Sequence, residues 1–243
     1  MKILSIDTAS DICGVSILDN ENLVCNLDSN TGRTHSENLM PMIQDAFTKT
    51  NLQIKDIDLL VCNKGPGSFT GIRIGVATVK AFTDSFDIPC IGISSLESLA
   101  YNTRDLIYDN DYVCSIIDCK NDNCYFALYE VKNKVFENLI EPQAENMDSA
   151  LSILDSYYKD TLLDSNIITF IGDGSKIYKD KIKEIFPNAK FVDDNLNNLN
   201  SYSLGIAGLI HYNSNIDIGN VLPLYLKKPQ AQKQLEEREK NKK

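Results

Sequence analysis

Hydrophobic and polar positions alternate in short blocks near the start of the chain. Apolar or alternating runs at 2–7, 13–18 and 22–27 are separated by polar turns, which is typical of antiparallel strands joined by hairpins. From 36 to 48 apolar residues recur at helical spacing after Ser and Thr, so this stretch predicts a helix. The pattern therefore predicts a three-stranded meander followed by one amphipathic helix.

A pattern of continuous apolar runs comes next. The run at 58–63 ends at a glycine-rich loop, the stretch 70–86 has apolar residues at helical spacing, and 89–94 is apolar again. Two strands joined by a crossover helix are parallel. The pattern therefore predicts a βαβ unit, followed by a short helix at 96–102.

The order of predicted elements repeats after a polar link near 103–111. The second set comprises strands at 112–118, 124–131, 134–140 and 167–171 and helices at 147–158 and 175–186. Although meanders are common, both halves have a βββαβα order, which is a repeat of element order without a repeat of sequence. An α/β protein with two similar domains is the expected class.

The expected domain organisation has four parts. A polar, Asn-rich stretch at 193–200 precedes a predicted helix at 201–212, and an extended segment then leads into a basic end. The parts are an N-terminal domain at 1–105, a second domain at 106–200, a helix and extended segment at 201–226 that pack back on the first domain, and a basic flexible tail at 227–243.

Composition excludes several classes of protein. With 243 residues, 43% of them hydrophobic, the chain can bury two cores of domain size. It has no apolar run long enough to span a membrane, and its first apolar stretch is too short for a signal peptide. We therefore expect a cytoplasmic protein without a membrane partner.

Cysteine and histidine are poorly placed for metal chemistry. The seven cysteines form no C-x-x-C pair, and most lie in predicted strands, which favours reduced, buried thiols. The only histidines are His35 and His211, and neither belongs to an H-x-x-x-H or H-E-x-x-H pattern. We expect no metal site.

The charge is acidic and uneven. The formal net charge is −10, but 227–243 carries seven Lys or Arg and three Glu. An acidic chain binds nucleic acid poorly on its own, because phosphate contacts come from Lys and Arg. Any action on RNA would therefore rely on a basic partner, with the tail as a minor contact; the alternative is that the tail is only a solubilising helix.

The glycine-rich loop CNKGPGSFTGIRIG does not match the common phosphate-binding templates. The P-loop requires a Lys after its second glycine, where this chain has other residues. The pattern Gly65-x-Gly67-x-x-x-Gly71 fits a dinucleotide loop in part, with Glu97 as the one nearby acidic residue. Because Pro66 removes a backbone N–H and a meander precedes the unit, NAD binding is disfavoured.

Two physical interpretations of the loop remain open. Loop residues Gly65, Gly67, Ser68 and Thr70 at a helix N-terminus would present N–H groups and hydroxyls to an anion. Gly71 and Gly75 lie on one face of the following helix and would let another backbone approach closely. The expected neighbour is the helix at 36–48 or the same helix of a second subunit.

Several motifs together resemble one family. They are Asp7-Thr8, Arg33-Thr34-His35-Ser36-Glu37, the string from Gly65 to Gly75, Ser94-Ser95-Leu96-Glu97, and Pro223-Leu224-Tyr225-Leu226-Lys227. These stretches resemble the TsaB (YeaZ-like) family of bacterial tRNA threonylcarbamoyladenosine biosynthesis proteins. Lys227 stands where Arg is commoner in that family.

The resemblance implies an actin-like ATPase (ASKHA, RNase H-like) fold, in which two βββαβα-type domains face a cleft. In that class the phosphates meet the turns after the first strand of each domain, here Asp7–Ser10 and Asp118–Asn121, although Ala9 replaces the usual glycine. Candidate nucleotide- or anion-binding residues are Asp7, Thr8, Gly65, Gly67, Ser68, Thr70, Asp118, Gly172 and Gly174. The resemblance implies no firm cofactor and leaves weak binding of ATP or ADP open.

The resemblance also implies a paralogue without catalytic residues. The catalytic relative has an H-x-x-x-H pair that binds a metal, whereas the matching positions here are Ser95 to Leu99, without histidine. The implied function is an accessory scaffold for transfer of threonylcarbamoyl from threonylcarbamoyl-AMP to the adenosine 3′ of the anticodon in tRNA. The alternative is an independent ATP-dependent phosphotransferase, or an M22-type peptidase, of the same fold.

Implied partners are a metal-containing TsaD-type transferase subunit, a TsaE-type small ATPase and a second copy of this chain, with tRNA contacted indirectly or through the tail. The helices at 36–48 and 70–86 carry more apolar residues than one sheet face covers, so we expect some to face a partner. Candidate interface residues are His35, Leu39, Met42, Ile43, Gly71, Ile72, Gly75, Val76 and Val79. His35 is expected in a capping or interface role.

Overall fold

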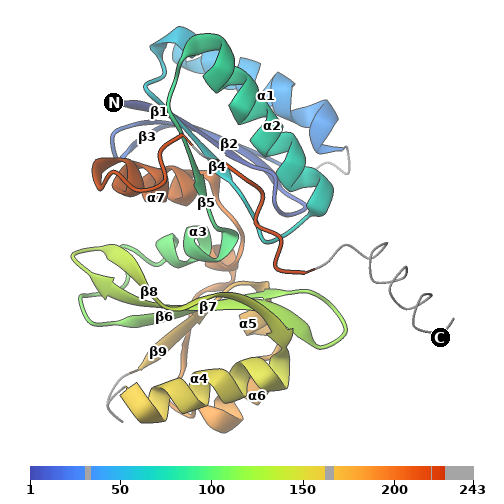
Figure 1. The fold of residues 1–243 in the computed structure, drawn as a ribbon, viewed down its shortest axis with the longest axis vertical. Helices are drawn as coiled ribbons and strands as arrows, with labels where there is room; N and C mark the ends of the chain where they lie inside the picture. The colour runs from blue at the N-terminus through green and yellow to red at the C-terminus, as the bar shows by residue number, and fades with distance from the viewer. Residues whose placement is uncertain (31–33, 162–166, 220, 228–243) are drawn as a thin grey trace, which may run out of the picture.

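The computed structural model describes residues 1–30, 34–161, 167–219 and 221–227. It contains two five-stranded mixed sheets with their helices (Figure 1). The first set is β1 (Lys2–Asp7), β2 (Cys13–Asp19), β3 (Asn22–Ser29), α1 (His35–Thr50), β4 (Leu59–Asn63), α2 (Phe69–Phe86), β5 (Cys90–Ile93) and α3 (Ser95–Tyr101). The second is β6 (Tyr112–Asp118), β7 (Asn123–Lys132), β8 (Val135–Asn146), α4 (Met147–Thr161), β9 (Ile168–Ile171), α5 (Asp173–Ile177), α6 (Lys179–Ile185) and β10 (Lys190–Phe191). Helix α7 (Ser201–Asn213) packs back on the first sheet.

The two sheets have the same topology. Their strand orders are β3-β2-β1-β4-β5 and β8-β7-β6-β9-β10. In each sheet the first three strands in sequence are antiparallel, and the next two are parallel to the first. The predicted repeat of element order is therefore confirmed, and we call the two halves the first and second lobes.

Five layers are stacked along the long axis of the molecule (Figure 1). Helices α1 and α2 cover the outer face of the first sheet, α4 and α6 cover that of the second, and α3 and α7 lie between the sheets. One apolar cluster fills each outer interface. A third cluster joins both sheets through α3 and α7 and includes Leu96, Tyr129 and Leu204, so the lobes share a core.

The structure corrects three details of the predicted elements. Strand β8 extends to Asn146 rather than 140. The predicted helix at 175–186 is two helices, because Tyr178 between them is non-helical (φ −100°, ψ 18°) and its hydroxyl donates to Asp118 Oδ1 at 2.9 Å. A 3-10 turn, Asp194–Asn197, lies within the stretch expected to be a loop.

Two further sequence expectations can be compared with the described residues. All seven cysteines are free of disulfides, and five of them are buried. No helix in the described part of the chain is both long and apolar enough to cross a membrane. The basic tail at 228–243 lies outside the described residues.

The glycines of α2 pack against the turn that follows β1. A Cβ at Gly75 would lie 2.5 Å from Thr8 Oγ1, and one at Gly71 would meet the carbonyl of Thr8. Thr8 Oγ1 in turn donates to the Gly71 carbonyl at 2.8 Å. The expected neighbour was helix 36–48 or a second subunit, and the structure corrects this: the close approach is to the chain's own first turn, with His35 as the one α1 residue beside Gly71.

Replacing Gly75 by leucine should destabilise the fold strongly. A side chain there would displace Thr8, which is buried and hydrogen-bonded, and overpacking of this kind costs about 3 kcal/mol or more. Ser68→Ala removes only the side-chain cap that accepts from the Gly71 N–H, which should cost about 1 kcal/mol. Urea unfolding of both variants checks this, and equal stability of Gly75→Leu and wild type would contradict the packing.

Candidate functional site

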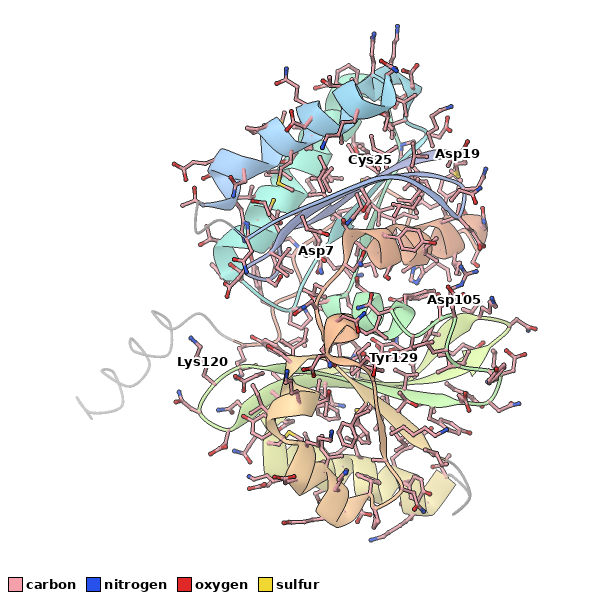
Figure 2. The ribbon with its side chains drawn as sticks, turned by 180° about the vertical axis from the view of Figure 1, so that it is seen from behind. Asp7, Asp19, Cys25, Asp105, Lys120 and Tyr129 are labelled. Carbon is pink, nitrogen blue, oxygen red and sulfur yellow. The ribbon has the colours of Figure 1, made fainter. Side chains whose placement is uncertain are left out.

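The turn after β1 is held by a buried hydrogen-bond network. Asp7, at the end of β1 (Figure 2), is 2% exposed. Its carboxylate accepts from the Ala9 N–H and from Asn63 Nδ2, both at 2.9 Å. Asn63 Oδ1 accepts from Ser95 Oγ at 2.7 Å and from the Gly65 N–H at 2.8 Å. The network thus links β1, β4, the glycine loop and the start of α3.

Burial dominates the electrostatics of Asp7. Removal from water raises the pKa of its carboxyl, and the hydrogen bonds from Ala9 and Asn63 oppose that rise. Two of the carboxylate's acceptor positions are used within the chain. In this conformation Asp7 positions the turn rather than facing solvent.

The glycine loop closes over the same turn. The Ser68 N–H donates to the Ala9 carbonyl at 2.7 Å, and a Cβ at Gly67 would meet that carbonyl. The Gly71 N–H donates to Ser68 Oγ at 3.2 Å. The N–H groups of Gly65 and Ser68, which were expected to face an anion, therefore bond within the chain, and Thr8 is fully buried. Of the loop candidates, Ser68 and Thr70 are exposed.

The corresponding turn of the second lobe is more open. Figure 2 shows Lys120 on the hairpin that follows β6, next to Asp118. The Asp118 N–H donates to Asp173 Oδ1 at 2.9 Å, and that oxygen also accepts from the Gly174 N–H at 2.8 Å. Gly172, with φ +101°, and Gly174 pack against the backbone of Ile116. The two lobes thus place the sequence-predicted residues in two separate clusters.

The glycine turn of the second lobe has structural roles of its own. Burial raises the pKa of the Asp173 carboxyl, against the two backbone hydrogen bonds that it accepts. The Gly172 N–H donates to Asn197 Oδ1 at 2.8 Å. The strand-to-helix turn at 172–174 therefore locks α5 onto β6 and the 3-10 turn, and nucleotide binding there stays a prediction.

The positions that would match the metal pair of the catalytic relative have other roles. Ser95 is fully buried and donates to Asn63, while Leu99 is 1% exposed and belongs to the core between the sheets. Across the described ranges, no group of three or more His, Cys, Asp or Glu side chains is arranged to hold a metal ion. The H-x-x-x-H positions are therefore part of the chain's packing.

The sequence interpretation missed an ion pair in the layer between the two sheets. Glu97 on α3 and His211 on α7 are separated by 114 positions, and Glu97 Oε1 lies 2.6 Å from His211 Nε2. Glu97 is 8% exposed. Burial alone would lower the pKa of His211, but the hydrogen bond and charge of Glu97 raise it, as does Asp217, while Lys64 opposes. No local pattern marks this pair, because its members meet only through the packing of α3 on α7.

The predicted interface residues lie mostly inside the protein. Leu39, Ile43, Ile72, Val76 and Val79 are 0–5% exposed and form the core between the first sheet and its helices. The expectation that this stripe is left over for a partner is therefore corrected, because the five-stranded sheet covers it.

Other predicted interface residues have partners in the chain. Gly71 and Gly75 pack on Thr8, and Met42 is half-buried against the same core. His35 Nε2 donates to the Ser10 carbonyl at 2.8 Å, so it ties α1 to the first turn. The residues that α1 and α2 do expose include Met40, Arg73, Ala77 and Ala81.

The segment Val221–Lys227, which we call the strap, runs from the first lobe to the second (Figure 1). Val221 is buried in the outer core of the first lobe, and the Leu224 N–H donates to the Lys64 carbonyl at 2.6 Å. The Lys227 ammonium lies 5.4 Å from the centre of the Tyr125 ring on β7. It also bonds the Cys119 thiol, whose pKa burial raises and Lys227 lowers.

Comparison with known proteins gives consistent results. The family model described as "TsaD: tRNA N6-adenosine threonylcarbamoyltransferase" matches residues 28–234. The tRNA threonylcarbamoyladenosine biosynthesis protein TsaB of Bacillus subtilis (strain 168) is 29% identical over 192 residues, which cover 79% of this chain and 80% of that protein. The sequence resemblance is thereby confirmed.

Solved structures confirm the fold class. YeaZ from Pseudomonas aeruginosa superposes with a TM-score of 0.74 at 20% identity, over 93% of this chain and 99% of that chain. The ROK hexokinase from Thermus thermophilus superposes with a TM-score of 0.53 at 9% identity, over 87% of this chain and 100% of that chain. At these identities the likeness shows the fold alone, which is the actin-like ATPase fold expected from the sequence.

The Glu97–His211 pair should make stability depend on pH. Because the folded-state pKa of His211 lies above its ordinary value, the stabilisation is complete below about pH 6.5 and is lost as pH rises through the folded pKa. We expect the free energy of unfolding to fall across that range. Urea unfolding from about pH 6 to pH 9 measures it.

Glu97→Gln should flatten this pH dependence, whereas Asp217→Asn, which removes a more exposed charge near His211, should reduce it only slightly. A pH profile of Glu97→Gln identical to that of wild type would assign the dependence to other groups.

Proposed function

This chain belongs to the tRNA N6-adenosine threonylcarbamoyltransferase (TsaD) family, and we propose that it acts in threonylcarbamoyladenosine biosynthesis as a non-catalytic subunit. Its partner in this role is the metal-containing transferase subunit, which transfers threonylcarbamoyl from threonylcarbamoyl-AMP to the adenosine 3′ of the anticodon. The similarity to the biosynthesis protein TsaB supports the pathway.

The observation that carries the non-catalytic role is the use of the metal-pair positions for packing. Ser95 Oγ donates to Asn63 Oδ1 in the network that holds Asp7, and Leu99 fills the core between the sheets. Neither side chain has the imidazole that a transition metal prefers, and neither is accessible to substrate. A reaction at this place would require the loss of both structural contacts.

The closed first turn supports the same role. In the fold class a nucleotide phosphate approaches the turn after β1, and here Thr8 is fully buried beneath the glycine loop. Ala9 is 3% exposed and its carbonyl is bonded to Ser68. This geometry favours a scaffold over a phosphotransferase, and weak nucleotide binding would involve the second lobe.

The docking face is the outer surface of α1 and α2. These two helices lie side by side on the outside of the first sheet (Figure 1). The exposed residues of α2 include Ala77 and Ala81, one turn apart, and Met40 on α1 is 51% exposed. Small side chains let a partner helix approach closely, and exposed methionine adapts to a partner surface. A second copy of the chain can compete for this face.

The other proposed partners are a small ATPase and tRNA, which the proposed role in threonylcarbamoyladenosine biosynthesis implies. A small ATPase would bind the assembled pair of subunits rather than this chain alone, and tRNA would be held mainly by the transferase subunit, since this chain has a net charge of −10. With these partners, the proposed location is the cytoplasm.

Ala77→Arg should weaken the mixed complex with the transferase subunit. A long charged side chain on the small-residue surface of α2 prevents close helix approach and weakens binding by about tenfold or more. Size-exclusion chromatography with light scattering on the mixed proteins measures the complex. The control is Ser152→Arg, which adds the same side chain to an exposed position of α4 in the second lobe.

Loss of the complex with Ala77→Arg but not with Ser152→Arg supports the docking face. A wild-type chain that forms no mixed complex, and that hydrolyses ATP with a turnover lost in Asp7→Ala, would replace the scaffold function by an independent activity.

A further inference from the structure

The two arginines in the described part of the chain have very different surroundings. Arg104 donates from Nη1 and Nη2 to the two carboxylate oxygens of Glu21 at 3.0 and 3.1 Å, the forked geometry that arginine favours. Arg73 has no carboxylate within ion-pair distance among the described residues, although the chain has 34 Asp and Glu. An exposed arginine without a counter-charge in so acidic a chain calls for a physical reason.

Arg73 is nevertheless held rigidly. Its guanidinium carbon lies 3.9 Å from the centre of the Phe69 ring and 5.6 Å from that of Tyr225. The Nε–H donates to the Tyr225 hydroxyl at 2.8 Å, across 152 positions of sequence. The two rings contact each other, with centroids 4.6 Å apart. Stacking and a fixed Nε leave the outer edge of the guanidinium, with Nη1 and Nη2, directed away from these contacts.

We infer that Arg73 is a binding anchor on the α2 surface, and that it receives a carboxylate from an Asp or Glu of the transferase subunit. This inference rests on the proposed function and names the chemistry of that contact. A guanidinium that is already ordered loses little side-chain entropy when a carboxylate binds its fork. Arginine with flanking aromatic rings is also the composition of binding hot spots.

The surroundings of Arg73 favour a protein carboxylate over an RNA phosphate. Along the exposed face of α2 the next side chains are the half-buried Ile74 and the small Ala77, which resemble the apolar part of a protein interface. Binding to an RNA backbone needs several cations that act together. The acidic net charge of the chain opposes RNA further.

Tyr225 is a positioning residue in this arrangement. It belongs to the strap, whose backbone is attached to the glycine loop by the bond from the Leu224 N–H to the Lys64 carbonyl. Its hydroxyl accepts from Arg73 Nε and its ring packs against that of Phe69 at an interplanar angle of 31°. The C-terminal motif and the glycine-loop motif thus meet at one exposed corner of the first lobe.

The test is the dissociation constant of the complex with the metal-containing transferase subunit, measured by isothermal titration calorimetry. Arg73→Lys keeps the charge but loses the fork and the Nε bond, so binding should weaken about tenfold. Tyr225→Phe keeps the stacking and loses only the hydrogen bond, so binding should weaken about threefold. Lys183→Gln, which removes an exposed cation on α6 of the second lobe, is the control and should leave binding unchanged.

The outcomes separate the two levels of the proposal. A wild-type chain that does not bind overturns the proposed function together with this inference. A wild-type chain that binds, with Arg73→Lys binding equally well or Lys183→Gln weakening binding as much, overturns the inference alone. Weaker binding of tRNA by Arg73→Lys with an unchanged protein complex would assign the arginine to RNA. Thermal unfolding of each variant confirms that the fold is intact.

Discussion

The close approach of α2 to the turn after β1 is the contact on which the first lobe depends. Gly71 and Gly75 allow Thr8 to lie directly against the helix backbone, and the bond from Thr8 Oγ1 to the Gly71 carbonyl fixes the distance. The glycine loop then closes over Ala9, and the Asp7–Asn63–Ser95 network joins β1, β4 and α3 behind it. The absence of side chains at Gly71 and Gly75 therefore determines the shape of the turn, the burial of Asp7 and the position of α2.

The layer of α3 and α7 connects the first sheet to the second. Helix α3 begins at the Asn63 network, and its side chains pack on α7 and on the second sheet in a shared core. The Glu97–His211 pair lies in this layer, and a buried ion pair contributes more to specific positioning than to net stability. Together with the strap, which reaches Tyr125 on β7, the layer ties two lobes of equal topology into one body. A chain with this construction suits a scaffold.

The buried and exposed sides of α1 and α2 differ in composition. The apolar stripe of α1 and α2 is buried, and their exposed side carries Ala77 and Ala81. Arg73 lies on the same side, against the ring of Phe69, which itself contacts Tyr225. The Gly65–Gly75 motif thus has two roles. Its glycines allow close packing inside the first lobe, whereas Phe69 and Arg73 form a contact at its surface.

Local pattern in the sequence was sufficient for the elements, for the repeated βββαβα order and for the fold class, because strand and helix periodicities are properties of neighbouring residues. It was not sufficient for the roles of individual side chains. Ile72, Val76 and Val79 were predicted to face a partner and are core residues, since coverage by a sheet depends on strands distant in sequence. The contacts Glu97–His211 and Arg73–Tyr225 span 114 and 152 positions. Only tertiary packing brings such groups together, so only the structure could decide which residues build the interior and which lie on the surface.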